Sequence, residues 1–421
     1  MYYWYKFFTY LFYPAAPIYL FFRKLKKKED EISFKEKLSL TKADRNEGFL
    51  VWLHVASVGE AMSVLPLVES FEENKKVKKI LITSLTLSSG NILRKRYKDN
   101  LKIFHQFLPL DIPILTKKFL ELWKPNISIF IDSEIWPNLI LQIKKKKIPL
   151  LLINARITKK TFDRWKLLPN FAKKIFKKFD LCIASNKETE NYLTKLGAQN
   201  VKNLGNLKFT RIKSYSDHSL DNSLINKIKD RKIWCAASTH YDEEILCGKA
   251  HLEIKKKFAN VLTIIIPRHI YRVDEIKKQL SKLKLKVELY SEKNLVDENT
   301  DIILVDSYGE SLKFYNLSKY VFLGKSLVKT LVLDGGQNPI ESARLGCKIF
   351  HGPNVSNFSE IYNYLKKLGI AKIVNNTNEI SLSLIEEFKL DRPKDQDVAR
   401  KIEDYGQKIF NNVIIEMKKY I

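Results

Sequence analysis

A chain of 421 residues is too long for one ordinary hydrophobic core, and domain-size statistics suggest about two to three domains. With 45% hydrophobic residues and only 14 Gly and 13 Pro, the composition excludes a low-complexity chain. The net charge of +27 suits an anionic membrane, an anionic substrate or a nucleic acid. Because the sequence contains no zinc finger and no aromatic RNA-binding strand, a nucleic-acid partner is not expected. The four cysteines lie far apart, without a CxxC motif, and predict free thiols in a reducing compartment.

Residues 1–24 form an aromatic-rich segment that ends in positive charge. Its uninterrupted apolar run, 7–22, is slightly short for a spanning helix, which needs about 20 residues, and Pro14 and Pro17 weaken it further. Two interpretations remain: a short signal-anchor, or a segment that lies in the membrane interface. A hydrophobic cap packed on the protein itself is the alternative. The basic cluster at 23–28 favours a main body on the cytoplasmic side of a membrane that contains anionic lipids.

The first domain is predicted at 25–205. From residue 49 to about 205 it alternates between strand and helix patterns, which predicts βαβ units and a parallel sheet. The helix-like segments include 60–73 and 186–196. The strand-like runs are 49–55, 79–84, 101–107, 127–131, 149–153 and 180–184.

A polar stretch, 206–225, is predicted to link this first domain to a second one at 226–395. The alternation restarts there, with strand-like runs at 233–237, 261–266, 285–290, 301–305, 319–323 and 347–351. The last segment, 396–421, is predicted as a basic amphipathic helix that packs back on the first domain. The fold class is therefore α/β, with two Rossmann-like domains and a ligand cleft between them. Neither GxGxxG nor GxxxxGK[ST] follows a first strand, so a classical NAD site and a P-loop are not expected.

The stretch 49–60 has the pattern of strand, tight turn and helix. Ser57 and Gly59 lie in the turn, and Glu60 begins the helix. Such a turn presents backbone N–H groups and a positive helix end to a ligand. Glu60 either complements the helix terminus or acts in the site. As a base at a helix start it would need a hydrophobic or acidic neighbour to offset the dipole.

Further polar residues of the first domain follow predicted strands. Asp132 and Glu134 come after the fourth strand and can bind a metal, orient a sugar hydroxyl or cap a helix. Arg156 follows the fifth strand, where a cleft role competes with an ordinary surface position. Asn206 and Lys208 lie where the first domain ends, and Lys208 is placed to contact an anion.

The second domain has polar residues at corresponding places. Ser238 ends its first strand and can cap a helix or hold a phosphate. Pro267, Arg268 and His269 end the next strand and are typical of an anion site, because a guanidinium makes planar, charge-assisted contacts to phosphate. The segment 306–310 follows a later strand.

The loop 335–341 combines two glycines, Gly335 and Gly336, with a predicted helix start. Glycine allows close approach of the backbone to a ligand. Asn338 is a predicted N-cap, with Pro339 in the first turn of a helix that runs to about residue 345. Glu341 can then accept hydrogen bonds from a vicinal diol such as a ribose, although an ordinary loop and cap is the alternative.

Taken together, these motifs resemble the 3-deoxy-D-manno-octulosonate (Kdo) transferases of lipopolysaccharide core biosynthesis, which use CMP-Kdo. The similarity runs in order from the N-terminal segment to about residue 365. The residues that carry it are His54, Ser57–Glu60, Glu134–Leu139, Asn154–Arg156, Gly205–Phe209, Ser238–His240, Pro267–His269, Gly309–Glu310 and Gly335–Glu341.

The resemblance implies a GT-B glycosyltransferase without cofactor or catalytic metal, with an acceptor-binding first domain and a CMP-Kdo-binding second domain. It implies that Glu60 is the general base that deprotonates a lipid A precursor hydroxyl for inverting attack on Kdo. Lys208 and Asp132 match residues that stabilise the transition state. The residues that match CMP contacts are Pro267, Arg268, Tyr308, Gly309, Glu310, Asn338, Pro339, Ile340 and Glu341.

One departure concerns Asp132, because the family usually has Glu at this position. Either the loop compensates for the missing methylene, or Glu134 takes more of the task. Other enzymes of the GT-B class, with a UDP- or GDP-sugar donor, and a non-catalytic membrane-surface adaptor are the alternatives. No motif encodes the number of Kdo units transferred.

Overall fold

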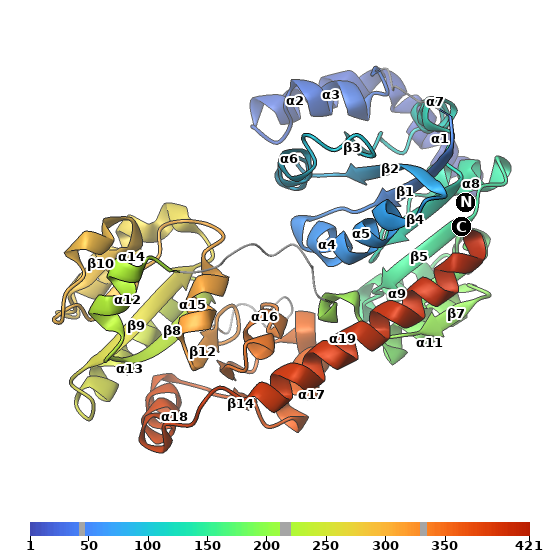
Figure 1. The fold of residues 1–421 in the computed structure, drawn as a ribbon. Helices are drawn as coiled ribbons and strands as arrows, with labels where there is room; N and C mark the ends of the chain where they lie inside the picture. Colours follow the sequence, from blue (N-terminus) through green and yellow to red (C-terminus); the bar gives the residue numbers. More distant parts are fainter. Residues whose placement is uncertain (42–46, 211–219, 329–334) are drawn as a thin grey trace. The chain divides into compact units, whose positions relative to one another are not determined.

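The computed structural model describes residues 1–41, 47–210, 220–328 and 335–421. The chain forms two compact units: Met1–Lys213 together with Gly406–Ile421 is unit 1, and Ser214–Tyr405 is unit 2 (Figure 1). Of the predicted linker 206–225, residues 211–219 lie outside the described residues.

Unit 1 is built on a parallel sheet of seven strands in the order β3-β2-β1-β4-β5-β6-β7. All six predicted strands are present, with ends shifted by a few residues. The sequence analysis missed β7, because three residues with little apolar character give no strand pattern. The strands are β1 (Phe49–His54), β2 (Val77–Ser84), β3 (Ile103–Phe107), β4 (Ile127–Ile131), β5 (Leu150–Ala155), β6 (Leu181–Ala184) and β7 (Val201–Asn203).

Helices follow most of these strands, as βαβ units require. The prediction of one helix over 60–73 was wrong: α4 ends at Ser63 and α5 begins at Leu65, because Pro66 has no N–H to continue the helix. The helices of unit 1 that follow strands are α4 (Val58–Ser63), α5 (Leu65–Glu73), α6 (Leu87–Arg96), α7 (Pro113–Trp123), α8 (Pro137–Lys145), α9 (Lys159–Lys166), α10 (Pro169–Phe176), α11 (Lys187–Leu196) and the 3-10 turn η2 (Leu207–Phe209).

The N-terminal segment folds as α1 (Tyr2–Leu11), η1 (Tyr13–Ala15) and α2 (Ala16–Leu25). No helix among the described residues is long and apolar enough to cross a membrane. One face of the segment packs on unit 1, with Ala16 and Leu20 fully buried, and the opposite face is exposed. The exposed large side chains are Tyr3, Trp4, Phe7, Phe8, Tyr10, Leu11, Phe12, Ile18, Tyr19, Phe21, Phe22 and Leu25. The segment thus packs on the protein through one face, as the alternative of a hydrophobic cap expects, and leaves large apolar side chains exposed on the other.

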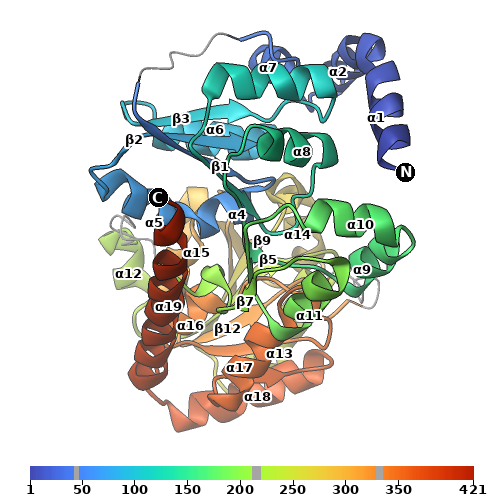
Figure 2. The ribbon, with the colours of Figure 1, turned by 90° about the vertical axis from the view of Figure 1, so that its right-hand side faces the viewer.

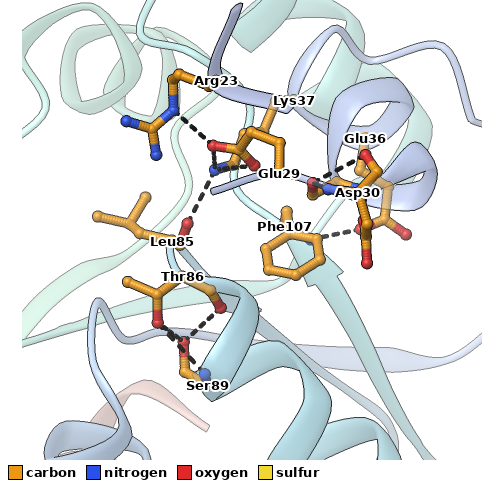
Figure 3. Close-up of polar contacts among 10 residues, drawn as sticks. Arg23, Glu29, Asp30, Glu36, Lys37, Leu85, Thr86, Ser89 and Phe107 are labelled. Atoms are coloured by element: carbon orange, nitrogen blue, oxygen red, sulfur yellow. Dashed lines mark hydrogen bonds and ion pairs between the residues drawn. The ribbon is translucent and has the colours of Figure 1, made fainter. Parts of the chain in front are cut away.

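A buried ion pair holds this segment on the sheet through α3 (Glu31–Lys37) (Figure 3). The ammonium group of Lys37 donates to Oε1 and Oε2 of Glu29 at 2.7 and 2.8 Å, and to the carbonyl of Leu85 at 2.9 Å. Arg23, near the end of α2, donates to Glu29 at 2.8 Å. Since Leu85 follows β2, these bonds connect the amphipathic segment to the carboxyl end of the sheet.

The neighbouring residue of α3 makes a second such connection. Glu36 accepts the backbone N–H of Phe107, the last residue of β3, at 2.7 Å (Figure 3). It also accepts the guanidinium of Arg94 at 2.9 Å. Burial raises the pKa of Glu36, and the Phe107 N–H and Arg94 oppose this rise. The α3 helix is thus tied to the ends of both β2 and β3.

Unit 2 contains a second parallel sheet of seven strands in the order β10-β11-β9-β8-β12-β13-β14. All six predicted strands are present, and β8 extends to Thr239, beyond its predicted end. The sequence analysis missed β14, again a strand of three residues. The strands are β8 (Lys232–Thr239), β9 (Val261–Pro267), β10 (Val287–Leu289), β11 (Ile302–Leu304), β12 (Tyr320–Leu323), β13 (Lys348–His351) and β14 (Ala371–Ile373).

The helices of unit 2 alternate with its strands. They are α12 (Asn222–Ile228), α13 (Glu243–Lys255), η3 (Ile270–Arg272), α14 (Val273–Ser281), η4 (Tyr290–Leu295), α15 (Ser311–Leu317), α16 (Ile340–Arg344), η6 (Ser356–Phe358), α17 (Ser359–Lys367) and α18 (Thr377–Leu390). The final helix, α19 (Gln396–Met417), begins in unit 2 and belongs to unit 1 from Gly406 on, and it is followed by η7 (Lys418–Tyr420).

A glycine seats the last part of α19 on unit 1. A Cβ at Gly406 would lie 1.8 Å from the carbonyl oxygen of Phe209, so a side chain does not fit there. Lys202 pairs with Glu416 at 2.8 Å, and the hydroxyl of Tyr420 donates to the carbonyl of Asp180 at 3.0 Å.

Both sheets reverse their strand order at one point, β1 next to β4 in unit 1 and β8 next to β12 in unit 2. Ligands of open α/β sheets bind outside the carboxyl ends of the strands at such a point. The candidate site residues follow strands at or close to these two reversals.

Candidate functional site

Glu60 lies in the first turn of α4, directly after β1. Its Oε2 accepts the backbone N–H of Ala56 at 2.6 Å, and its Oε1 accepts the hydroxyl of Ser57 at 3.0 Å. Ser57 is the N-cap of the helix and accepts the backbone N–H of Glu60 at 3.4 Å. The carboxylate is therefore bonded like a capping residue and held in one orientation at the switch point. A Cβ at Gly59 would meet nothing within 4 Å, so packing does not require glycine there.

The pKa of Glu60 is raised to about 7. Burial is the largest cause, and the negative charges of Asp132 and Glu134 add to it. The N–H of Ala56 and the hydroxyl of Ser57 act in the opposite direction. The acidic neighbours offset the helix terminus, so Glu60 can exchange a proton near neutral pH.

Asp132 follows β4, the strand beside β1, so the two carboxyl groups belong to adjacent strand ends. Its φ of +61° is the left-handed conformation, which a residue with a side chain rarely adopts. The backbone is held there by two bonds, from its own N–H to the carbonyl of Ile153 at 3.1 Å and from the N–H of Arg156 to its carbonyl at 3.3 Å. Burial raises the pKa of Asp132, and the cations of Lys208 and Arg156 counteract the rise.

Glu134 is engaged by two side-chain donors. Its Oε2 lies 3.1 Å from Nε2 of His54 and accepts the indole N–H of Trp136 at 2.8 Å. Nδ1 of His54 in turn lies 2.9 Å from the hydroxyl oxygen of Thr83. Burial alone would raise the pKa of Glu134, but the bonds from His54 and Trp136 hold it below its ordinary value. Glu134 thus stays ionised and adds negative charge beside Glu60.

Lys208 lies in η2, after β7, and its loop is fixed by two amides. The side chain of Asn206 accepts the backbone N–H of Lys208 at 2.9 Å. Asn154, at the end of β5, accepts the N–H of Leu207 at 2.8 Å. Burial lowers the pKa of Lys208, Asp132 and Glu60 raise it, and Arg156 lowers it. These mutual effects on pKa show that five ionisable residues of unit 1 lie close together: Glu60, Asp132, Glu134, Arg156 and Lys208.

Two residues beside these five were named in the sequence analysis for the resemblance but were not predicted as site residues. His54 is the fully buried end of β1, and Asn154 is a buried residue with φ +54° at the end of β5. Both are polar residues at the end of an apolar run, and this pattern could have identified them. Their bonds to Glu134 and Leu207 position charged neighbours.

In unit 2, basic side chains gather around the ends of β8 and β9. The backbone N–H of Arg268, whose side chain is exposed, bonds to the carbonyl of Thr239 at 2.9 Å. The rings of His240 and His269 lie edge to face with centroids 5.5 Å apart. Burial, together with the charges of His269, Lys325 and Arg268, lowers the pKa of His240 to about 4, and its bond to the carbonyl of Ser238 opposes this shift. The arrangement favours an anion.

Glu243 organises this end of the sheet, and sequence reasoning gave it no role beyond an acidic helix start. Its carboxylate is fully buried and accepts four backbone N–H groups at 2.7–2.9 Å. They belong to His240, Lys325, Ser326 and Leu327. Glu243 therefore ties the loop after β12 to the loop after β8 at the switch point of unit 2. Ser238, with φ +54°, lies just before this junction.

The segment after β11 is open to solvent. Tyr308 is 62% exposed, and Gly309 has a φ of +88° that favours glycine. Glu310 precedes α15 and pairs with Lys313 at 2.9 Å. The structure thus leaves the Tyr308 ring accessible to a ligand.

The loop before α16 contains Gly336 in the left-handed region, with φ +91°. A Cβ there would lie 2.9 Å from Cα of Val355, so the close approach is to this chain itself. The predicted helix start is wrong by one position: α16 begins at Ile340, which makes Pro339 the N-cap. Asn338 still accepts the N–H of Ile340, at 3.2 Å, and half-buried Glu341 lies in the first turn. Gly335 is buried.

Within the described ranges, no group of three His, Cys, Asp or Glu side chains is arranged to hold a metal ion. The predicted independence of metal and cofactor stays a prediction, as do the roles assigned to each site residue.

A family model described as 3-deoxy-D-manno-octulosonic-acid transferase (kdotransferase) matches residues 32–211. The 3-deoxy-D-manno-octulosonic acid transferase of Rickettsia bellii is 34% identical over 358 residues, which cover 85% of this chain and 84% of the relative. The enzyme of the same name from Haemophilus influenzae is 30% identical over 337 residues, or 78% of this chain and 76% of the relative.

Solved structures show the same architecture at low identity. UDP-GlcNAc 2-epimerase from Neisseria meningitidis superposes with a TM-score of 0.60 at 15% identity, covering 89% of this chain and 100% of that chain. A glycosyltransferase from Rickettsia africae gives a TM-score of 0.55 at 11% identity, covering 89% of this chain and 98% of that chain. These similarities establish a fold like that of GT-B glycosyltransferases.

Proposed function

The chain belongs to the 3-deoxy-D-manno-octulosonic acid (Kdo) transferase family, and we propose that it moves Kdo from CMP-Kdo to a lipid A precursor at the inner membrane. Enzymatic Kdo transfer is common to the family. The acceptor, the stereochemical course, the residue roles and the location are the parts proposed here.

The proposed reaction is a single inverting displacement. Glu60 takes the proton of a glucosamine hydroxyl, and the oxygen forms a bond to the anomeric carbon of Kdo. The bond from that carbon to the phosphate oxygen breaks, and its electron pair leaves with CMP. Inversion follows because one nucleophile attacks opposite one leaving group. The proton remains on Glu60 and is then lost to solvent.

The observation that carries this proposal is the electrostatic setting of Glu60. A carboxylate with a pKa of about 7 is ionised enough at neutral pH to accept a proton and basic enough to assist its removal. The pKa of Glu60 is raised by burial and by the two acidic residues that follow the adjacent strand. A carboxylate that served only as a helix cap would gain nothing from these neighbours.

Lys208, Arg156 and Asp132 are proposed to stabilise charge that changes during transfer. Lys208 and Arg156 supply positive charge, and both already act on Asp132. Preorganised charges of this kind lower the barrier because they need no rearrangement at the moment of reaction.

Unit 2 is proposed to bind the CMP-Kdo donor. Arg268, exposed at the end of β9, supplies positive charge for the phosphate, and the rings of His240 and His269 lie beside each other next to it as hydrogen-bonding groups with lowered pKa values. Exposed Tyr308 and the helix start at Glu341 are proposed to contact the nucleoside.

The segment α1–α2 is proposed to lie in the membrane interface, parallel to its plane. Its outer face is aromatic and aliphatic, and basic residues Arg23 and Lys24 lie in the last turn of α2. Apolar and aromatic side chains on one face with basic residues nearby are typical of helices that lie on a bilayer.

The function is tested by the mass of the product. Purified protein is incubated with CMP-Kdo and a tetra-acylated lipid A precursor, and in parallel with UDP-sugars. Addition of one or more Kdo masses with CMP-Kdo, and no product with UDP-sugars, is expected. Product formation from UDP-sugars but not from CMP-Kdo would contradict the proposal.

A further inference from the structure

A groove in unit 1 lies between α1, α7 and α8, away from the residues assigned to catalysis. Figures 1 and 2 both place these three helices next to one another. The groove has a volume of about 650 Å³, within the range of about 300–1,000 Å³ typical of small-molecule sites. We refer to it as the lysine groove.

Positive charge dominates its lining. Five lysines contribute to it against one acidic residue, Glu121. Glu121 is 3.8 Å from Lys117 and 4.0 Å from Lys146, which is not part of the lining. The other four lysines, which pair with no carboxylate in the described part of the chain, are Lys6, Lys118, Lys145 and Lys174. Like charges gathered at one concave site favour an anionic ligand, which reduces their mutual repulsion.

One lining residue, Asn138, is a buried amide with an unpaired acceptor. Asn138 is only 1% exposed, and its Nδ2 donates to the carbonyl of Asp111 at 2.7 Å and to the hydroxyl of Thr9 at 2.9 Å. Because a carbonyl can only accept, the NH₂ group must point to Asp111, which fixes the orientation of the amide. Oδ1 of Asn138 is buried and has no hydrogen-bond partner among the described residues. A ligand with a hydroxyl donor would satisfy it.

The edge of the groove is continuous with the exposed aromatic face of α1. Lys6 and Tyr10 line the groove, and Trp4, Phe7 and Phe8 of the same helix are exposed beside them. If these aromatic side chains enter the apolar boundary of a bilayer, the groove lies at the level of the lipid headgroups.

The helix that forms this edge is held firmly in place. The hydroxyl of Tyr5 donates to Asp111 at 2.8 Å, and Asp111 accepts the backbone N–H groups of Asn138 and Leu139, at the start of α8, at 3.0 and 2.8 Å. This edge of the groove is therefore fixed by bonds within the chain, and a ligand hydroxyl reaches the buried Oδ1 of Asn138 when a lining side chain moves aside.

We propose that the lysine groove binds the headgroup of an anionic phospholipid that carries hydroxyl groups, with phosphatidylglycerol as the fitting chemistry. The phosphodiester is held by the lysines, and a glycerol hydroxyl donates to Oδ1 of Asn138. This proposal rests on the membrane attachment proposed above and adds a lipid-selective site to it.

The first test measures partition of the full chain onto vesicles by sedimentation. Vesicles of 30% phosphatidylglycerol in phosphatidylcholine are compared with pure phosphatidylcholine. The double variant Lys118→Gln/Lys145→Gln is expected to lose about tenfold to thirtyfold in partition onto the anionic vesicles. The control Lys75→Gln/Lys195→Gln removes the same charge from exposed positions outside the groove and is expected to lose less than about threefold. Equal losses in both variants would show only general surface attraction and would overturn the site.

The second test separates hydroxyl recognition from charge. Phosphatidylmethanol carries the same phosphodiester charge as phosphatidylglycerol but no hydroxyl. We expect the wild-type chain to prefer phosphatidylglycerol vesicles by about threefold to tenfold, the contribution of one buried hydrogen bond. Equal partition onto the two anionic lipids would contradict the part assigned to Asn138.

These measurements also distinguish failure of the groove from failure of the membrane proposal. Equal binding of the wild-type chain to neutral and anionic vesicles would contradict the lipid site in the groove but not the membrane attachment through α1–α2. Absence of binding to all vesicles would contradict both. Far-ultraviolet circular dichroism and thermal unfolding of each variant establish that a loss of binding does not come from a loss of fold.

Discussion

Nε2 of His54 lies 3.1 Å from Oε2 of Glu134, so this carboxylate is already engaged at the end of β1. The indole of Trp136 donates to the same oxygen at 2.8 Å. Asp132, in contrast, is acted on by the cations of Lys208 and Arg156. The two acidic residues after β4 therefore have different neighbours, which favours Asp132 for contact with the reacting groups and Glu134 for setting the charge around Glu60.

This difference predicts unequal effects of amide substitutions. Asp132→Asn is expected to lower kcat by about 10²–10³, the usual loss for a charge that stabilises a transition state. Glu134→Gln keeps an acceptor for His54 and should lower kcat by about tenfold. Steady-state kinetics with CMP-Kdo and a lipid A precursor measures both. A larger loss in Glu134→Gln than in Asp132→Asn would transfer the main acidic role to Glu134.

The raised pKa of Glu60 predicts a pH dependence. A base must be ionised, so kcat/KM should fall about tenfold per pH unit below an inflection near pH 7 and level off above it. Glu134→Gln removes a negative charge that raises this pKa, so its inflection should move to lower pH. An inflection of the wild-type enzyme near the ordinary value of 4.5 would exclude Glu60 as the titrating base.

The same shift predicts a gain in stability when the charge of Glu60 is removed. The folded-state pKa of about 7 lies above the ordinary value of 4.5, so the folded state holds the proton more tightly. Ionising Glu60 therefore costs stability as the pH rises from 4.5 to about 7, and the cost remains above that. At pH 8, Glu60→Gln should have a free energy of unfolding roughly 1–3 kcal/mol higher than wild type and should unfold at a higher temperature. At pH 4.5 the two proteins should unfold at similar temperatures.

Thermal unfolding at these two pH values distinguishes a strained base from a helix cap. If Glu60 served only to cap α4, the amide would weaken its bonds to Ala56 and Ser57. Glu60→Gln would then lower the unfolding temperature at pH 8.

The four backbone bonds to Glu243 predict that unit 2 depends on its carboxylate. An amide has one oxygen, and its NH₂ group would face the N–H donors of the loop 325–327. Glu243→Gln should therefore destabilise unit 2 by about 1–3 kcal/mol and raise the KM for CMP-Kdo more than that for the acceptor. Glu387→Gln is a matched control, since this partly buried carboxylate of unit 2 lies 3.9 Å from Lys348, has no assigned role in the site and accepts no backbone N–H in the described structure. Unchanged stability of Glu243→Gln would show that the loop after β12 does not depend on these bonds.

The ion pair in Figure 3 predicts that unit 1 loses stability when one partner is removed. Lys37→Met leaves Glu29 buried with only Arg23 to neutralise it and should cost about 3–5 kcal/mol. The double variant Glu29→Gln/Lys37→Met should recover part of this loss, because no uncompensated charge remains. Chemical denaturation of the wild type, the two single variants Glu29→Gln and Lys37→Met, and the double variant gives the coupling energy, and strictly additive losses would contradict a buried pair.

The sheets were largely predictable from the sequence because buried parallel strands have continuous apolar runs. Glu60, Asp132 and Arg156 were found as site candidates because each follows such a run. The short strands β7 and β14 were not predicted, since their positions depend on neighbours in the sheet. The break between α4 and α5 was missed although Pro66 marks it.

The contacts that organise each switch point lay beyond sequence reasoning. Glu243 bonds to residues more than eighty positions away, and no local sequence pattern predicts such a partner. Asn154 and His54 act in the same way on Leu207 and Glu134. Sequence reasoning also predicted that a hydrophobic or acidic neighbour offsets the helix terminus at Glu60. The structure identifies the cause as burial together with Asp132 and Glu134.

The most direct test of the central claim is the rate of Kdo transfer by Glu60→Gln. Single-turnover product mass is followed at pH 8 with CMP-Kdo and a lipid A precursor, beside wild type and beside Glu73→Gln, a control at an exposed position of α5. The account predicts that Glu60→Gln is slower by about 10³ or more while it remains folded, and that the control is unchanged within about twofold. A Glu60→Gln rate within about tenfold of wild type would contradict the assignment of Glu60 as the base.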